Sequence, residues 1–221
     1  MRLPKFALEF KIKAMKNMKL VEEDHKQVLG LQLPTDPRWV DLTVVSLEDI
    51  LSDHAFCEQK AATSCISLIQ GYSDHEELVR ELAPIVTEEW GHFRQVLAEM
   101  DKRGLKLGRQ RKDEYVGELL KFENKSGDRN DRLIEKLLIC ALIEARSCER
   151  FRQLSLFLDD AHLKTFYHKF MVSEAGHYRL FIDLAKLYGK NEEKVMDRWK
   201  EYLRYEAELM TRLEVRGDRM H

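Results

Sequence analysis

Residues 89–93 read Glu-Trp-Gly-His-Phe, and residues 174–178 read Glu-Ala-Gly-His-Tyr. Both segments place a glutamate three residues before a histidine, so in a helix the two side chains project from one face. Another glutamate precedes each segment at a nearly constant distance. These residues, Glu58 and Glu144, each stand in an apolar line of helical period. The chain therefore contains two similar halves, each with one glutamate followed by a Glu-x-x-His motif.

The segments that carry these motifs have the periodicity of long helices. Apolar residues recur every three or four positions, and Ser, Asp, Asn or Gly stands near most ends. The pattern predicts helices over residues 46–70, 73–104, 113–122, 131–158, 159–189 and 191–213. Ser73 and Glu76 are expected to form a capping box, and Pro84 should kink or split that second helix. Residues 1–45 show no clear period, apart from a turn at 33–37.

The composition fits an all-α protein. The 221 residues are 44% apolar and include only four prolines and ten glycines, so one domain with a substantial core is expected. The net charge of −2 means that any nucleic-acid binding must use a local patch. No apolar run is long enough to cross a membrane. The cysteines form no CxxC pair, and we interpret them as reduced thiols of a cytoplasmic protein: Cys57, Cys65, Cys140 and Cys148.

Together the two halves predict a metal centre. If the four long helices form a bundle, the halves supply four carboxylates and two imidazoles: Glu58, Glu89, His92, Glu144, Glu174 and His177. Di-iron proteins with ferritin-like four-helix bundles use this donor set. Carboxylate with imidazole suits iron or manganese better than a structural zinc site. Four carboxylates facing a core without cations would repel one another, which disfavours the alternative that they bind nothing.

Other acids and histidines fit the pattern less well. Glu88 does not stand three residues before His92, and Glu149 does not match the gap between the halves. His54 lies one helical turn before Glu58 and is a candidate for contact with that ligand. The other histidines lack a partner at helical spacing and are expected at the surface or its edge: His25, His75, His162, His168 and His221.

A basic segment lies between the two halves, at residues 102–112. It contains no acidic residue and has six cationic side chains: Lys102, Arg103, Lys106, Arg109, Arg111 and Lys112. On a protein with little net charge, such a cluster can bind the phosphates of a nucleic acid. The alternative is an ordinary solvated loop, and the charge pattern alone does not separate the two interpretations.

Four segments of the chain resemble the bacterial tRNA hydroxylase family. They are 33–40 (Leu-Pro-Thr-Asp-Pro-Arg-Trp-Val), 88–93 (Glu-Glu-Trp-Gly-His-Phe), 103–116 (Arg-Gly-Leu-Lys-Leu-Gly-Arg-Gln-Arg-Lys-Asp-Glu-Tyr-Val) and 173–178 (Ser-Glu-Ala-Gly-His-Tyr). The resemblance covers roughly residues 30–221. It implies one ferritin-like domain over residues 31–221, with residues 1–30 as a variable extension.

The resemblance also implies an activity. Members of the family hydroxylate the isopentenyl group of methylthio-isopentenyl-adenosine beside the anticodon of tRNA, using O₂ and two non-haem iron ions. Iron ligation would fall on the six residues of the predicted metal centre, and the basic segment would contact the anticodon loop. Electrons would come from an unidentified electron-transfer protein or reductase, since the chain shows no flavin or nicotinamide fingerprint.

Two other interpretations stay open at this point. The chain could be another ferritin-like di-iron or di-manganese protein, such as a ferroxidase, a peroxidase or a catalase. The absence of CxxC pairs speaks against a peroxidase with an additional four-cysteine iron site. It could also be a helical interaction protein without enzymatic activity, which the metal content of the purified protein would distinguish.

Overall fold

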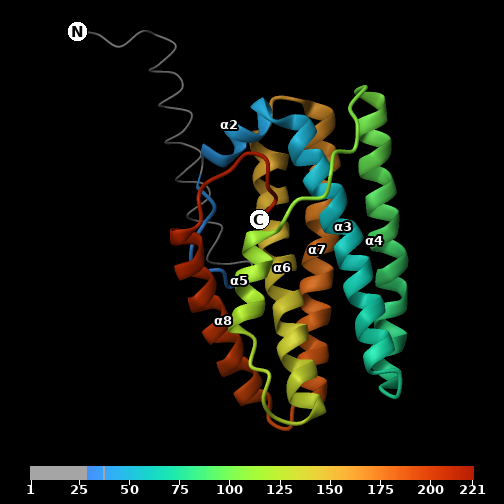
Figure 1. Ribbon diagram of the computed structural model, residues 1–221, viewed down its shortest axis with the longest axis vertical. Helices are drawn as coiled ribbons and strands as arrows, with labels where there is room; N and C mark the ends of the chain where they lie inside the picture. Colours follow the sequence, from blue (N-terminus) through green and yellow to red (C-terminus); the bar gives the residue numbers. More distant parts are fainter. Residues whose placement is uncertain (1–28, 37) are drawn as a thin grey trace, which may run out of the picture.

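Four long helices run side by side in the computed structural model, which describes residues 29–36 and 38–221 (Figure 1). In this part of the chain the elements are α2 (Arg38–Val45), α3 (Leu47–Gly71), α4 (Glu76–Lys102), α5 (Glu114–Phe122), α6 (Arg129–Phe157), α7 (Ala161–Tyr188) and α8 (Glu192–Arg212), with no strand. Helices α3, α4, α6 and α7 form the bundle, and the others flank it. The predicted all-α bundle with extra flanking helices is confirmed. The predicted extension over residues 1–30 lies almost wholly outside the described residues.

Local signals explain most helix ends. Asp113, Asp160 and Asn191 accept backbone N–H groups in the first turns of α5, α7 and α8. Asp128 forms a capping box with Asp131 at the start of α6. These four helices begin and end within two residues of their predicted bounds. None of the described helices combines the length and the apolar character that a membrane span requires.

The start of α4 differs from the prediction. This helix begins at Glu76, and no side chain caps it, so the predicted capping box with Ser73 is wrong. The chain first completes another turn, in which the N–H of His75 donates to the carbonyl of Tyr72 at 2.9 Å. Pro84 lies inside α4, which continues unbroken past it, so the helix is not split.

The sequence does not predict α2, because this helix is stabilised by contacts with residues far away in the sequence. Trp39 of this helix is fully buried, and its indole N–H donates to the carbonyl of Arg219 at 3.1 Å. The guanidinium of Arg150 lies 4.6 Å from the centre of the same ring. An eight-residue helix is too short to be stable alone, so these tertiary partners hold it.

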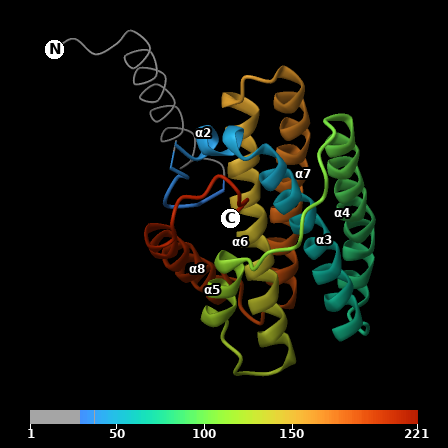
Figure 2. The ribbon, with the colours of Figure 1, turned by 45° about the horizontal axis from the view of Figure 1, so that its top comes forward.

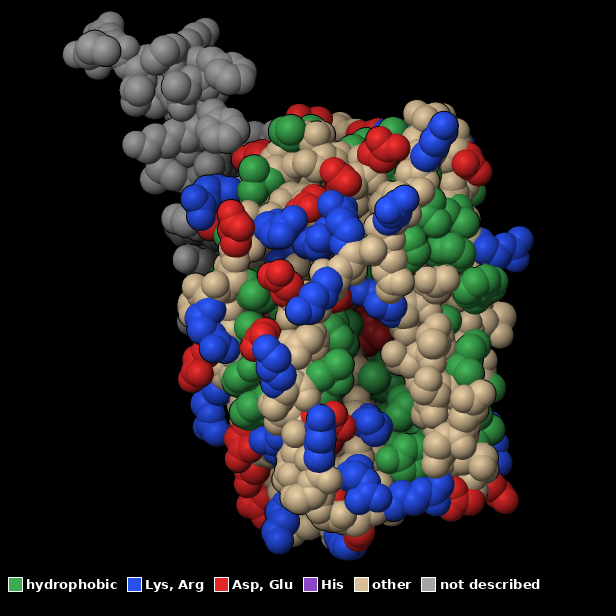
Figure 3. Space-filling model, viewed as in Figure 1, with side chains coloured by type: hydrophobic (Ala, Val, Ile, Leu, Met, Phe, Trp, Pro, Cys, Tyr) green, Lys and Arg blue, Asp and Glu red, His purple; other side chains and the backbone are tan. Residues whose placement is uncertain are grey.

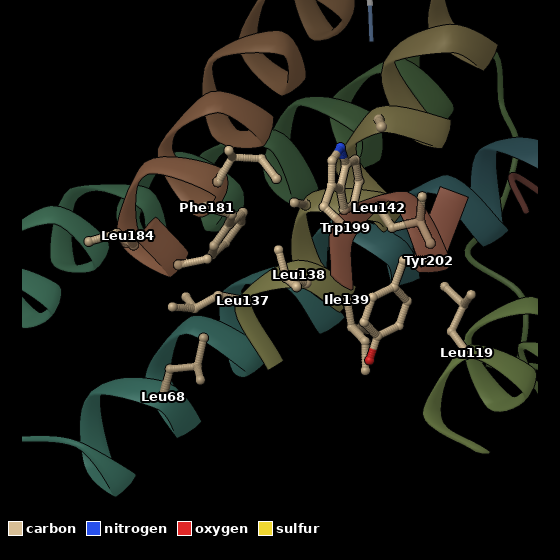
Figure 4. Close-up of a cluster of buried hydrophobic side chains, with 14 of the residues drawn as sticks. Leu68, Leu119, Leu137, Leu138, Ile139, Leu142, Phe181, Leu184, Trp199 and Tyr202 are labelled. Carbon is tan, nitrogen blue, oxygen red and sulfur yellow. The ribbon is translucent and has the colours of Figure 1, made fainter. Parts of the chain in front are cut away.

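Two apolar clusters fill the bundle, one toward each end. The first includes Leu68, Leu82, Leu137 and Phe181, and the second includes Leu51, Phe93, Phe151 and Phe170. Figure 4 shows the first cluster, where Trp199 and Tyr202 of α8 lie against Leu138 and Leu142 of α6. Helix α8 therefore covers one face of α6 and extends the core beyond the four-helix bundle. Along α3, α4 and α7, the predicted metal ligands lie between the residues of the two clusters.

A buried ion network holds the segment before α2 against the bundle. Arg146 of α6 is fully buried and lies 2.6 Å from Glu206 of α8 and 3.1 Å from Glu149. It also donates to the carbonyl of Leu33 at 2.9 Å, while the hydroxyl of Thr35 donates to Glu149 at 2.5 Å. An uncompensated buried charge is costly, so these contacts stabilise the position of both the segment and α8.

Helices α3 and α6 leave a groove between them. The closely packed helix pairs of the described chain include α3 with α4 and α6 with α7, but not α3 with α6. The segment between α4 and α5 crosses in front of α3 and leads into α5 beside α6 (Figures 1 and 2). This side of the bundle contains two cavities, which are described below.

Candidate metal centre

All six predicted ligands meet in the middle of the bundle. They come from α3, α4, α6 and α7 in turn: Glu58; Glu89 and His92; Glu144; Glu174 and His177. None is more than 7% exposed. Helical periodicity turns each of them inward at the level between the two apolar clusters, so the two halves of the sequence meet as predicted.

The ligand atoms form two overlapping sets, and in each set the atoms lie within 4.8 Å of one another. Each set has its own histidine and the glutamate that precedes that histidine's Glu-x-x-His motif. Glu89 and Glu174 belong to both sets. Because a carboxylate has two oxygens, one glutamate can bind two ions at once. Glu89 and Glu174 could therefore each supply an oxygen to both ions.

Both histidines turn Nδ1 toward the carboxylates. His92 Nδ1 lies 3.2 Å from Glu58 Oε2 and 3.4 Å from Glu89 Oε2. His177 Nδ1 lies 2.7 Å from Glu89 Oε1 and 3.1 Å from Glu174 Oε2. Two donors about 2.1 Å from one ion, at right angles, are separated by about 3 Å. The observed separations are of this size.

Three of the four carboxylates are harder to ionise than usual when no cation is bound. Burial, and then the charge of a neighbouring glutamate, raises the pKa of Glu58 and Glu144 well above its usual value. Burial and the charge of Glu89 raise the pKa of Glu174 to about 7. Close contacts with the two imidazoles lower the pKa of Glu89 in spite of its burial.

Unsatisfied oxygens also indicate a missing cationic partner. Both carboxylate oxygens of Glu89 and one of Glu174 are buried and accept no well-aligned hydrogen bond from the described residues. Buried polar atoms without partners are uncommon in folded proteins. The four carboxylates and two imidazoles thus fit two iron or manganese ions both in donor type and in geometry.

Glu88, which the spacing argument rejects as a ligand, faces both histidines from behind. Its Oε2 lies 3.3 Å from His177 Nε2, and its Oε1 lies 3.9 Å from His92 Nε2. The hydroxyl of Ser173 donates to the same carboxylate at 2.5 Å. A carboxylate in this position orients a ligating imidazole and raises its basicity. The four-residue spacing from Glu88 to His92 is the sequence signal that could have indicated this contact.

His54 lies directly behind Glu58. It is completely buried among aromatic rings, 4.7 Å from the ring centres of both Phe151 and Phe170. Its Nε2 lies 2.7 Å from Glu58 Oε1, although the ring is not aligned for a good hydrogen bond. Burial, and then the nearby His92, lowers the pKa of His54 well below its usual value. A neutral imidazole therefore supports Glu58, and the predicted contact between the two residues is observed.

An inner cavity of about 520 Å³ leads from the groove to the carboxylates. All four glutamates of the centre line it, and neither histidine does. Apolar side chains, including Val116, Ile143 and Phe181, form much of its wall. Figure 3 shows the hollow on this face, with apolar side chains around it and an acidic side chain at the bottom. Access to the centre is therefore from its carboxylate side.

One wall of the inner cavity is polar. The ammonium of Lys60 lies 2.7 Å from Asp113, and the imidazole of His221 lies 2.9 Å from the hydroxyl of Ser147. Tyr115 stacks on His221 with 5.2 Å between ring centres. The side chain of His221 is only 3% exposed, so its predicted surface position is wrong. The burial of this histidine depends on residues far away in the sequence.

The predicted basic segment lies between α4 and α5, beside the inner cavity. Arg103 and Arg111 form close ion pairs within the fold, and the exposed Lys102 lies 3.6 Å from Glu99. Arg103 lies 2.7 Å from both Glu99 and Asp160, and Arg111 lies 2.8 Å from Asp218. The other four are exposed: Lys102, Lys106, Arg109 and Lys112. The segment thus combines structural ion pairs with a smaller exposed basic surface.

Comparison of the sequence with known proteins identifies a family that includes this chain. Residues 21–221 match the family model described as tRNA-(MS[2]IO[6]A)-hydroxylase (MiaE). A protein of Pseudomonas putida named tRNA 2-(methylsulfanyl)-N(6)-isopentenyladenosine(37) hydroxylase is 37% identical, over 72% of this chain and 76% of its own length. A Salmonella typhimurium protein of the same name is 27% identical, over 71% of this chain and 75% of its own length.

A solved structure shares the fold. It is described as protein 43 with aldehyde deformylating oxygenase activity from Synechococcus. Its TM-score is 0.80 at 30% identity, and the match covers 86% of this chain and 94% of that chain. The predicted ferritin-like architecture is confirmed by this similarity.

Proposed function

The chain belongs to the MiaE family of tRNA hydroxylases, and we propose that it uses O₂ and two iron ions to hydroxylate the isopentenyl group of methylthio-isopentenyl-adenosine at position 37 of tRNA. One observation carries the proposal. In a chain of this family, four carboxylates and two imidazoles are buried together at the bottom of a cavity. The relatives named above supply the substrate and the modified position.

Each ion would take the histidine and the first glutamate of one half as its own ligands, while Glu89 and Glu174 would bridge the two ions. When bound, the iron pair supplies the activation of O₂, with electrons from an external donor protein or reductase. The chain itself holds the donor atoms in place. Glu88 orients the imidazoles, and His54 supports Glu58. Surrounding apolar side chains exclude water from the reacting carbon.

The inner cavity fits the modified base. Its volume of about 520 Å³ lies within the usual range for small-molecule sites, roughly 300–1,000 Å³. The isopentenyl group would lie against Val116, Ile143 and Phe181, close to the carboxylates. A base inside a stacked anticodon loop cannot reach this depth, so it must be turned out of the loop first. Lys60 and Asp113 would face the polar part of the nucleotide.

The exposed members of the basic segment would contact the tRNA backbone. Lys106, Arg109 and Lys112 are exposed on the segment whose Gln110 lines the inner cavity, and their charge would attract phosphate without reading the base sequence. Because tRNA is the substrate, we place the reaction in the cytoplasm. The electron donor would be a separate protein.

Mass spectrometry of tRNA nucleosides tests this function. Cells that contain or lack the gene are grown in air, and we expect the hydroxyl on the prenylated adenosine to disappear when the gene is absent. Reintroduction of the unaltered gene should restore it. Prenylated adenosine that is equally hydroxylated in both strains would contradict the proposal.

The metal centre needs its own test. Glu144→Ala and Glu174→Ala should each abolish stable loading of two iron ions per chain and with it the hydroxylation. Glu77→Ala, at an exposed position of α4, is the matched control and should load normally. A chain that loads iron and consumes O₂ but never alters prenylated tRNA would instead favour a ferroxidase.

A further inference from the structure

A second, outer cavity continues the inner one along the groove between α3 and α6. Its volume is about 600 Å³. Five residues line both cavities: Thr63, Ser64, Val116, Cys140 and Ile143. The shared wall makes the two cavities one continuous groove. The outer part leads away from the carboxylates, toward the first turns of α6.

The face of α6 that lines this groove changes character along its length. Starting from the first turn, the groove-lining side chains are Arg129, Arg132 and Lys136, followed by Ile139, Cys140 and Ile143, and then by Glu144 at the metal centre. With a rise of 1.5 Å per residue, Lys136 and Arg132 lie about 12 and 18 Å along the helix from Glu144. A prenyl group, a purine and a ribose placed end to end have a comparable length. Figure 3 shows Lys and Arg side chains gathered below the hollow on this face.

The three cations differ in how far their charge is compensated. Arg129 forms two 2.6 Å hydrogen bonds to Asp74, and its guanidinium lies over the Tyr72 ring. Lys136 lies 3.3 Å from Glu123, whose side chain is 9% exposed, while that of Lys136 is 46% exposed. An ammonium has three donors, so this single pair leaves Lys136 able to bind another anion from the groove. Among the described residues, the guanidinium of Arg132 donates only to the carbonyl of Gly127, and it has no carboxylate partner. Arg132 and Lys136 are therefore the cations available for another anion.

We propose that the outer cavity binds the nucleotide next to the modified adenosine, and that Arg132 and Lys136 hold its phosphates. The inference rests on the proposed function, because it takes prenylated RNA as the substrate. Single-stranded RNA fits this groove for two reasons. Its phosphates are anionic and can pair with the cations of α6. Its unstacked bases can pack against apolar side chains such as Ile139 and Ile143.

Arg129 closes the far end of this cavity in a different way. Its guanidinium is fixed by Asp74, by the carbonyl of Gly71 at 2.7 Å and by the ring of Tyr72. The guanidinium plane of Arg129 is therefore fixed in orientation, and its positive charge is already compensated by Asp74. A fixed guanidinium plane suits stacking on a base better than binding a phosphate. For this reason the test leaves Arg129 unchanged.

The test compares two matched double variants. Arg132→Glu with Lys136→Glu reverses the two proposed contacts, four residues apart on α6. Lys200→Glu with Arg204→Glu reverses the same residue types at the same spacing on α8, where both side chains are exposed and line neither cavity. The probe is an anticodon stem-loop RNA that carries methylthio-isopentenyl-adenosine. Its dissociation constant is measured by fluorescence anisotropy at two salt concentrations.

We expect the α6 variant to bind the stem-loop about tenfold or more weakly, and its plot of log affinity against log salt to become shallower by about 1.4. The α8 variant should bind like the unaltered protein. Iron content, helicity and hydroxylation of the free nucleoside should be unchanged in both. Stem-loop affinity within twofold of normal in the α6 variant, or an equal loss in the α8 variant, would overturn the inference.

The same experiment separates this inference from the proposed function. If the unaltered protein hydroxylates the stem-loop and the α6 variant binds it equally well, only the outer cavity loses its assignment. If the unaltered protein, loaded with iron and supplied with a reductant and O₂, neither binds nor hydroxylates the stem-loop, the function itself is wrong. Arg132→Ala with Lys136→Ala provides a milder variant with the same expected direction, should charge reversal disturb α6.

Discussion

Single side chains behind the ligands determine how well the metal centre holds its ions. Glu88 faces the Nε2 atoms of both histidines and accepts a hydrogen bond from Ser173. If it orients the imidazoles, Glu88→Ala should lower the affinity for Fe²⁺ by about 10- to 100-fold, while an excess of iron still fills the centre. Competition with a coloured chelator measures this affinity.

Glu77→Ala is the appropriate control for Glu88→Ala, because it removes an exposed glutamate from the same helix. Its iron affinity should be unchanged. Glu88→Gln should lie between the two, since an amide can still contact one imidazole. An unaltered affinity in Glu88→Ala would remove Glu88 from the description of the centre.

The sequence correctly identifies those side chains whose positions follow from a local geometric rule, such as helical spacing. The three-residue spacing of Glu89 and His92 places both side chains on one helix face in any environment. The contact of Glu88 with His177 has no such rule, because it joins α4 to α7 through side-chain conformations. The burial of His221 depends on Ser147 and Tyr115, which belong to other parts of the chain.

Among the elements, α8 is held against α6 by two buried carboxylates, Glu206 and Glu135, and Glu135 supports a prediction about pH. Glu135 lies 2.8 Å from Arg198 and accepts hydrogen bonds from Tyr202 at 2.7 Å and from the N–H of Asn124 at 2.8 Å. Burial alone would raise the pKa of Glu135, but the hydrogen bonds from Arg198, Asn124 and Tyr202 outweigh it and lower the pKa. The interaction therefore stabilises the fold above the pKa of the unfolded chain and is lost as the pH falls through the folded value.

Glu135→Gln should lower the free energy of unfolding by about 1.5–3 kcal/mol at neutral pH. The difference from the unaltered protein should shrink as the pH falls below about 5, where the unfolded chain begins to take up the proton. Urea unfolding at several pH values measures it. Glu201→Gln removes an exposed partner of the same arginine and should have little effect at any pH. A pH-independent loss in Glu135→Gln would contradict the assignment.

The segment between α4 and α5 supports a separate prediction about RNA. Reversing the charge of Lys106, Arg109 and Lys112 together should weaken tRNA binding about tenfold and reduce its salt dependence, with unchanged iron content. Filter binding at two salt concentrations measures this. Arg111 is left out because its ion pair with Asp218 holds the segment in place. Unchanged tRNA affinity would mean that the segment is an ordinary solvated loop.

Helices with strong local signals were predictable, and those that depend on distant contacts were not. The ends of α6 and α7 follow from Asp128 and Asp160, which cap them within their own first turns. Helix α2 has no comparable signal, because the indole of Trp39 finds its partner at Arg219, near the other end of the chain. Ser73 has the right residue type for a cap, yet a turn occupies its position.

For the molecule as a whole, metal and stability are linked. The centre concentrates four carboxylates in the core, so ions that bind only the folded chain must stabilise it. At about 100 times the dissociation constant, each bound Fe²⁺ should add roughly 2.7 kcal/mol, which corresponds to a rise in Tm of roughly 5–10 °C per ion. Thermal unfolding under anaerobic conditions, with and without a chelator, measures this. Glu174→Ala should show no rise, and an equal Tm with and without iron would contradict the assignment.

The four-helix bundle was predictable from the repeat, but the groove was not. Two hairpins with matched motifs must face each other if their ligands are to meet, whatever the remaining contacts are. The separation of α3 from α6 depends on how α5 and the preceding segment pack, and neither shows this in its composition. For the same reason, the basic side chains at the start of α6 do not stand out in the sequence from other helix-surface charges.

The sharing of Glu89 and Glu174 between the two sets of ligands has a consequence for how the protein fills with metal. If Glu89 and Glu174 serve both ions, binding of one ion would fix both carboxylates and so prepare donors for the second, and chains with a single ion should be scarce. An under-supplied sample would then be a mixture of empty and fully occupied molecules rather than a population carrying one ion each. An average of fewer than two ions per chain would then give the fraction of chains that have bound metal. A plot of bound metal against metal concentration would be sigmoidal rather than hyperbolic.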